Sequence, residues 1–233
     1  MRDFLEEEEV ARHGASRAGH VQCVQVRLVT LSTGEVYVTE KQWLRATLIG
    51  CPWHPEGGCG FCHHGTYPRK RPRGTLIARW YCPVERRTVS ALPDALASHF
   101  SGTLADVEAH VRATEQGVSM ESVAMNRRLE IELPGALRYL SRLCKAVHKV
   151  LNICRGLRPQ LLCTAQPTIT SFSVLLEEPN VLMSLRQHVA RHLPQLPTPL
   201  GFNPSRNTAV ARLNSFQQQT GRDPPCAMLE PAS

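Results

Sequence analysis

The residues of this chain that can do chemistry are concentrated between positions 51 and 93. That segment holds four of the nine cysteines and three of the ten histidines. Cys59 and Cys62 are separated by two residues, a spacing at which both thiolates of one tight turn can face a single ion, and Gly60 eases the turn. This density of soft and borderline ligands predicts a structural metal site. Its candidate ligands are Cys51, His54, Cys59, Cys62 and Cys82.

The order of these residues along the chain is typical of a zinc ribbon, in which short strands connect ligand-bearing turns. An alternating run from Ile77 to Tyr81 leads into Cys82, about twenty residues after the first pair. The usual second pair of cysteines is incomplete, because Glu85 stands where the partner of Cys82 would fall. We therefore expect the ligands Cys51, Cys59, Cys62 and Cys82, with His54 as the first substitute and His63, His64 and Glu85 as weaker ones. The alternative for Cys51 is a small buried apolar residue.

Two enzymatic interpretations of the same residues conflict with what surrounds them. A redox dithiol at Cys59 and Cys62 would lie where a strand meets a helix, but glycine, proline and histidine surround this pair and no helical pattern follows. A zinc deaminase places its two motifs on separate helices, and the residues between His54 and Cys59 are too few to supply them. We expect neither activity.

The sequence RWYCPVERRTVSALPDAL, residues 79–96, resembles the second knuckle of the zinc ribbons found at the front of bacterial insertion-element transposases. In that family an aromatic–cysteine strand is followed by a Thr-x-Ser-x-Leu-Pro exit into a helix. The resemblance covers residues 51–100, and the helical region behind it is similar to the same group of mobile-element proteins. It implies DNA recognition or an accessory role in transposition, beside a partner transposase. Glu85 departs from the family's pattern of cysteines.

Basic residues are concentrated in the candidate ribbon as well. Seven lysines and arginines against two glutamates give the segment 51–93 a net charge of +5, out of +7 for the whole chain. Basic side chains held on a small rigid fold suit phosphate contact and the release of counterions. The candidates for nucleic-acid contact in this segment are Arg69, Lys70, Arg71, Arg73, Arg79, Arg86 and Arg87. The alternative is a solvated basic loop.

Composition sets the class of protein. A chain of 233 residues with a pI near 9.1 has room for one to two domains and favours an anionic partner. No apolar run approaches the length of a membrane span, and the acidic start MRDFLEEEEV is not a secretory signal. An odd number of cysteines, several within helical patterns, favours a reducing compartment, so we expect a cytoplasmic protein.

No catalytic pattern appears in the sequence. A transposase of the RNase-H-like kind holds metal ions with three carboxylates on a β-sheet, but no strand pattern follows Pro93 to carry them. The aspartates after that point are Asp94, Asp106 and Asp223. A phosphate-binding P-loop and the Gly-x-Ser-x-Gly of hydrolases are also missing from the sequence. We therefore expect a protein that is not an enzyme.

The hydrophobic pattern predicts an α+β fold. A β-hairpin is expected from Val21 to Thr39 with a turn at 32–34, followed by a short helix at 41–49. The expected regions are a flexible N-terminus at 1–20, the hairpin and short helix at 21–50, the zinc ribbon at 51–93, a helical domain at 94–193 and a Pro-rich, mostly disordered tail at 194–233.

The helical domain begins with a pattern that resembles a helix-turn-helix. A helix capped by Ser101 or Thr103 ends at Gln116, and Gly117 separates it from a second helix that begins after Ser119 and continues to Leu129. The side chains of the second helix that would face a DNA groove are Ser119, Glu121, Ser122, Asn126 and Arg127. An ordinary helical hairpin is the alternative.

A long helix is expected from Pro134 to Arg155, with an apolar stripe on one side. Its basic flank consists of Arg138, Arg142, Lys145 and Lys149, which are further candidates for nucleic-acid contact. Two shorter helices are expected at 168–178 and 180–193, and the cysteines at 144, 154 and 163 are expected in the core.

These patterns together predict a protein whose ribbon is folded by structural Zn²⁺ and which binds DNA as an accessory or regulatory protein of a mobile element. The alternative is a protein-interaction adaptor whose ribbon docks a partner transposase or transcription machine. The sequence leaves the oligomeric state, and the choice between DNA and RNA, open.

Overall fold

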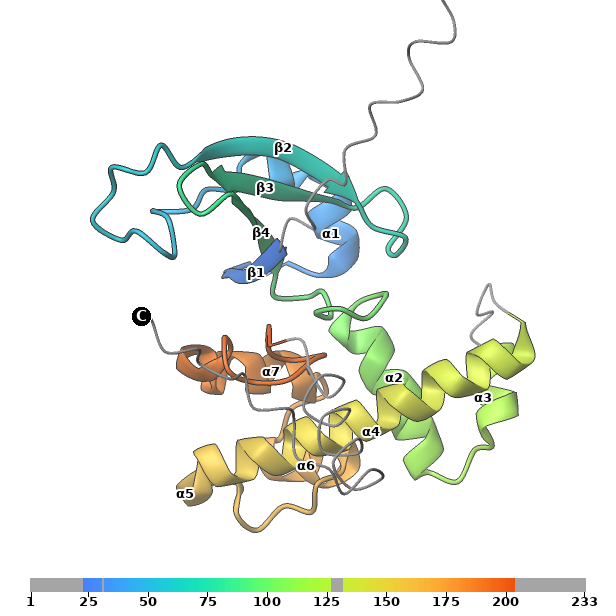
Figure 1. Cartoon of the computed structure of the whole chain (residues 1–233). Helices are drawn as coiled ribbons and strands as arrows, with labels where there is room; N and C mark the ends of the chain where they lie inside the picture. The colour runs from blue at the N-terminus through green and yellow to red at the C-terminus, as the bar shows by residue number, and fades with distance from the viewer. Residues whose placement is uncertain (1–22, 31, 127–131, 204–233) are drawn as a thin grey trace, which may run out of the picture. The chain divides into compact units, whose positions relative to one another are not determined.

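The computed structural model describes residues 23–30, 32–126 and 132–203 of the chain. It has a mixed α+β fold in which a four-stranded sheet is followed by helices (Figure 1), which confirms the expected fold class. The strands are β1 (Cys23–Leu28), β2 (Cys62–Pro68), β3 (Leu76–Cys82) and β4 (Arg87–Pro93), and their order in the sheet is β1-β4-β3-β2.

Three of the strands form the antiparallel meander expected of a ribbon. β2 pairs with β3 and β3 pairs with β4, each in antiparallel register. The alternation of β3 places Ala78 and Trp80 in a small buried cluster with Val89 and Ala91 of β4. Because successive side chains of a strand point to opposite faces, Ile77 packs instead into the core formed with the helices.

The expected hairpin at 21–39 is wrong. Its first half is β1, but β1 pairs in parallel with β4, and its second half is the helix α1 (Gly34–Thr39). Thr33 caps this helix by accepting a hydrogen bond from the amide of Val36, and Tyr37 is fully buried with its hydroxyl donating to the carbonyl of Leu76. The burial of one aromatic side chain against the sheet thus overrides the local β propensity of Val36 and Val38. The expected helix at 41–49 is reduced to one 3₁₀ turn, η2 (Gln42–Leu44).

The first two helices behind the sheet form as expected. α2 (Leu104–Glu115) begins with a capping box between Thr103 and Asp106, and α3 (Met120–Asn126) begins after Ser119, whose hydroxyl accepts from the amide of Ser122. Between them Gly117 has φ +85°, a conformation that favours glycine. The expected end of the second helix, 127–129, lies outside the described residues.

The remaining helices build the main core. They are α4 (Leu133–Leu157), α5 (Pro159–Leu162), α6 (Ile169–Leu176), α7 (Val181–His188) and the 3₁₀ turn η3 (Ala190–His192). The buried stripe of α4 packs with Ile77 and Leu92 of the sheet in one hydrophobic cluster. Cys144 and Cys154 are buried in it as expected, and burial raises the pKa of Cys154 to about 12. The expectation for Cys163 is wrong, because this side chain is exposed.

The expected disordered tail does not begin at Pro194. Leu196, Leu200 and Phe202 are buried in the main core. The fully buried Arg186 of α7 donates to the carbonyls of Pro199 and Leu200. Burying a guanidinium requires acceptors for its donors, and backbone carbonyls of an irregular segment supply them. The fold therefore includes residues 194–203, and residues 204–233 lie outside the description.

Candidate metal centre

Four side chains of the ribbon converge on one point. The ligand atoms of Cys51, His54, Cys59 and Cys82 all lie within 4.8 Å of one another. The three cysteines are buried and His54 is half-buried. Three thiols and one imidazole at this separation can hold a metal ion.

Local backbone geometry brings these residues together. Cys51 opens a turn in which the amide of His54 donates to the carbonyl of Cys51, so both side chains are on the same side of the chain. The loop that returns to Cys59 has φ +83° at Gly57 and +78° at Gly58, and these values favour glycine. Cys82 is the last residue of β3 and delivers the fourth ligand from the sheet.

Cys62 is absent from this cluster, contrary to the expected ligand set. It is the first residue of β2 and pairs with Tyr81 in the β2–β3 register. Paired residues share one face of a sheet, whereas neighbours in a strand point to opposite faces, so Cys62 lies on the face opposite to Cys82. Its side chain is exposed. The strand register therefore separates the two members of the C-x-x-C pair, and His54 takes the fourth position.

Hydrogen bonds to sulfur affect the cysteines of this cluster differently. The amide of Glu85 donates to Sγ of Cys82 over 3.5 Å, which is the arrangement of a metal-binding knuckle even without a second cysteine. Burial raises the pKa of Cys51, but hydrogen bonds from the His54 ring and from the amides of Trp53 and His54 outweigh it and lower the pKa from 9.0 to about 7. Burial and the two neighbouring thiols raise the pKa of Cys59.

The imidazole of His54 has a defined orientation. Its Nδ1 lies 3.5 Å from Sγ of Cys51 and 3.6 Å from Sγ of Cys82. Its Nε2 lies 3.9 Å from a carboxylate oxygen of Glu85. Nδ1 is therefore the ligand atom, and Glu85 is the acidic group on the other side of the ring. From the sequence, Glu85 was expected only as a weak ligand. The structure places it beside the His54 ring instead, outside the cluster.

The other weak ligand candidates point away from the centre. His63 packs its ring against Trp80 at 5.3 Å between centroids, and His64 packs against Tyr81 at 5.4 Å. Both histidines are exposed on β2. Neither histidine belongs to the cluster.

The basic residues of the ribbon divide into engaged and exposed side chains. Arg69 donates to the carbonyls of Ala97 and Phe100, and burial lowers its pKa. Arg79 donates to the hydroxyl of Thr88 and lies over the ring of Tyr67. Arg87 lies over the ring of Trp53. Arg69, Arg79 and Arg87 thus have structural roles that the charge pattern did not reveal.

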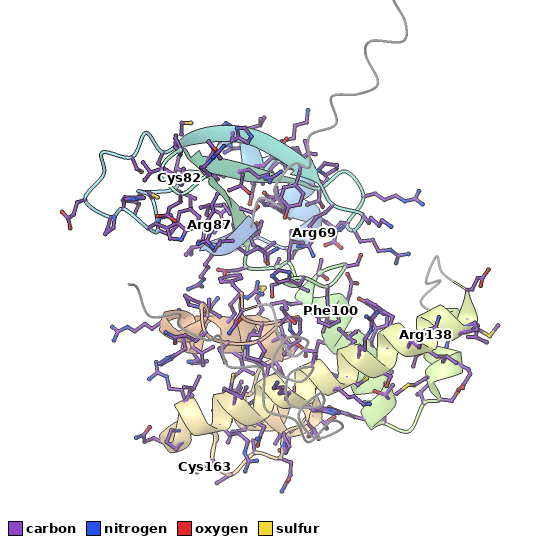
Figure 2. The ribbon with its side chains drawn as sticks, viewed as in Figure 1. Arg69, Cys82, Arg87, Phe100, Arg138 and Cys163 are labelled. Atoms are coloured by element: carbon purple, nitrogen blue, oxygen red, sulfur yellow. The ribbon has the colours of Figure 1, made fainter. Side chains whose placement is uncertain are left out.

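The more exposed basic residues lie at opposite ends of β3. Lys70 and Arg73 are exposed in the β2–β3 loop, where Arg71 is half-buried, and Arg86 is exposed in the β3–β4 turn. A strand of this length separates the two ends by about 20 Å. Figure 2 shows Cys82 and Arg87 toward one end of the strands and Arg69 toward the other.

The candidates of the helical domain are accessible. Ser119 and Asn126 are exposed at the two ends of α3, Ser122 is half-buried, and Arg127 lies outside the described residues. The basic flank of α4 is exposed along its length, as the periodicity predicts, at Arg138, Arg142, Lys145 and Lys149.

Comparison with protein-family models, with curated proteins and with solved structures gives no match to this chain. The resemblance to transposase ribbons therefore remains an expectation from the sequence pattern. Among the helices in the described part of the chain, none combines the length and apolar character needed to cross a membrane.

Proposed function

We propose that the ion held by Cys51, His54, Cys59 and Cys82 is Zn²⁺ and that its role is structural. Three thiolates and one imidazole form one of the donor sets of structural zinc sites. Zinc bonds of 2.3 Å to sulfur and 2.0–2.1 Å to nitrogen in a tetrahedron place the sulfur and nitrogen atoms about 3.6 Å apart. The separations of 3.5 and 3.6 Å from Nδ1 of His54 fit this value.

A site with four protein ligands has no open position for substrate, so zinc would supply folding energy and no chemistry. Metal analysis of the purified protein tests this assignment. One equivalent of zinc is expected for the wild type, and less than a tenth of that for Cys59→Ser. Zinc-free protein that folds and unfolds like the loaded form would overturn it.

We infer that the protein binds DNA and has no catalytic centre of its own, in keeping with an accessory or regulatory role in a mobile element. The observation that carries this proposal is the run of four exposed basic residues along α4, beside a capped helix pair joined at Gly117. Basic side chains at helical spacing can contact successive phosphates, and the second helix of such a pair can enter a major groove.

A titration of zinc-loaded protein against duplex DNA from its own locus and against a scrambled duplex, each at two salt concentrations, tests the DNA proposal. Tighter binding to the locus that weakens with salt supports sequence recognition. Equal, salt-sensitive binding to both duplexes supports phosphate contact alone. Absence of binding to either duplex at low salt would overturn it.

A second candidate function is a protein adaptor, and an open hollow beside the metal centre favours it. The hollow has a volume of about 370 Å³ and is lined in part by Leu48, Ile49, Phe61 and Trp80. Ile49 is fully exposed at this hollow, so it is accessible to a partner protein. Co-purification of a partner that Ile49→Asp abolishes, together with indifference to added DNA, would favour the adaptor over the DNA binder.

A further inference from the structure

The β2–β3 loop is fixed against the start of the helical domain. Arg69 at its base donates to the carbonyls of Ala97 and Phe100, which lie in the segment between β4 and α2. Pro72 at its tip packs close to Gly34 and Thr103, because a Cβ atom at Gly34 would lie 2.6 Å from Thr103 Cγ2 and 3.2 Å from Pro72 Cγ. The loop is therefore held against this segment at Arg69 and Pro72.

The same segment between β4 and α2 also contacts α4, through Tyr139. The hydroxyl of Tyr139 donates to the carbonyl of Ser101, and its ring lies 6.0 Å from that of Phe100. Arg69 and Tyr139 thus meet around Phe100, although 70 residues separate them in the sequence. Figure 2 shows Arg69 on the side of the sheet that faces Phe100.

The charges around Tyr139 report that these two basic segments are neighbours. Burial raises the pKa of Tyr139, the carboxylate of Asp106 raises it further, and the guanidinium groups of Arg69, Arg71 and Arg142 lower it. Tyr139 therefore lies close enough to arginines of both the β2–β3 loop and α4 for their charges to affect its pKa.

A groove continues this surface between α3 and α4. It has a volume of about 890 Å³, and its lining includes Arg138, Ser141 and Arg142 of α4 and Met120 and Glu121 of α3. The two arginines are one helical turn apart, which places them about 6 Å apart along the helix axis. Their guanidinium groups and the hydroxyl of Ser141 are donors that suit phosphate oxygens.

We propose that the β2–β3 loop from Lys70 to Arg73 and the first turns of α4 from Arg138 to Arg142 form one composite surface for the phosphate backbone of duplex DNA. The inference rests on the proposed function and adds the place of the contact. The sheet and the helical domain then bind DNA as one unit. Among the described residues, the carboxylates that these contacts place at this surface include Asp106, which is held in the capping box, and Glu121, which is exposed in the groove.

The test measures DNA affinity against salt for matched charge removals. Lys70→Gln and Arg86→Gln each remove one exposed charge, from opposite ends of β3. We expect Lys70→Gln to reduce the slope of log affinity against log salt by about 1, and Arg138→Gln with Arg142→Gln to reduce it by about 2. Arg86→Gln is expected to leave the slope unchanged. Glu121→Gln is expected to strengthen binding, because it removes a like charge from the phosphate path.

Zinc content and helical circular dichroism are checked for every variant, so that a loss of fold is not read as a loss of contact. A loop variant with the wild-type slope, beside an α4 variant with a reduced one, would overturn the composite surface and leave a DNA-binding helix. An effect of Arg86→Gln equal to that of Lys70→Gln would overturn it as well. Wild-type protein that fails to bind duplex DNA at low salt would instead overturn the proposed function itself.

Discussion

The carboxylate of Glu85 lies 3.9 Å from Nε2 of His54, on the side of the ring opposite to the thiols of Cys51 and Cys82. The distance of 3.9 Å exceeds the reach of a hydrogen bond, so the carboxylate acts on the ring as a nearby negative charge. The glutamate at the position of the missing cysteine thus lies beside the histidine that takes the fourth place in the cluster.

Glu85→Ala should weaken metal binding by at most about 10-fold, the lower end of the range for hydrogen-bonded partners, because the imidazole loses a nearby carboxylate that lies beyond hydrogen-bond distance. Competition with a chromophoric chelator measures the change. Glu56→Ala is the matched control, since it removes an exposed glutamate from the loop between Cys51 and Cys59. Equal affinities for the two variants would show that Glu85 is merely a surface residue.

Cys62→Ser should retain one equivalent of metal, because its thiol lies outside the cluster. Cys59→Ser and His54→Ala should each lose most of it. The spectrum of the cobalt-substituted protein adds a second readout, since replacing one sulfur ligand changes the charge-transfer bands and replacing Cys62 should not. Loss of metal from the Cys62 variant would instead support Cys62 as a ligand, as expected from the sequence.

The metal-free ribbon should gain stability as pH rises from about 7 to 9. The folded state lowers the pKa of Cys51 from 9.0 to about 7. The contribution of its thiolate is therefore complete above the unfolded value and is lost as pH falls through the folded value. Thermal unfolding of metal-free wild type and Cys51→Ser across this range measures it. A constant difference between the two proteins would contradict the expected pH dependence.

Removal of the metal should disturb the sheet and spare the helices. All three tryptophans of the chain belong to the sheet half, and Trp53 packs against the cysteine cluster. The main core consists mostly of residues outside the sheet, joined by Ile77 and Leu92 of the sheet, and lacks the ligand cysteines. A chelator should therefore change tryptophan fluorescence while most of the helical circular dichroism remains, and Cys59→Ser should show no response. Simultaneous loss of both signals would mean that the ribbon and the helices unfold together.

Arg186→Met should destabilise the protein by about 3–5 kcal/mol, because it leaves several buried carbonyls without a donor. The guanidinium donates to the carbonyls of Pro93, Asp94 and Leu96 as well as to those of residues 199 and 200. Urea unfolding followed by circular dichroism measures the loss. Arg191→Met, at an exposed site of η3, is the control and should change stability little.

Local signals predicted the parts of the fold that local interactions decide. The helix cap at Thr103, one of the two candidates in the sequence, appears where it was expected, as do the break at Gly117 and the stripe of α4. The choice between Cys62 and His54 depends on the register of β2 against β3, and a one-residue difference moves a side chain to the other face. Sequence spacing carries no information on that register. The segment 194–203 was missed for a similar reason, since its order depends on the distant Arg186.

The hydrogen bonds of Arg186 also bear on how such a chain can change during evolution. A zinc ribbon can be regarded as an independent module that is attached to different domains. Here Arg27 of β1 pairs with Asp94, and Arg69 at the end of β2 donates to the carbonyls of Ala97 and Phe100. A cut after Pro93 would leave both arginines without these partners and would take the carbonyl of Pro93 from Arg186. We therefore expect related chains to carry the ribbon and the helices behind it together.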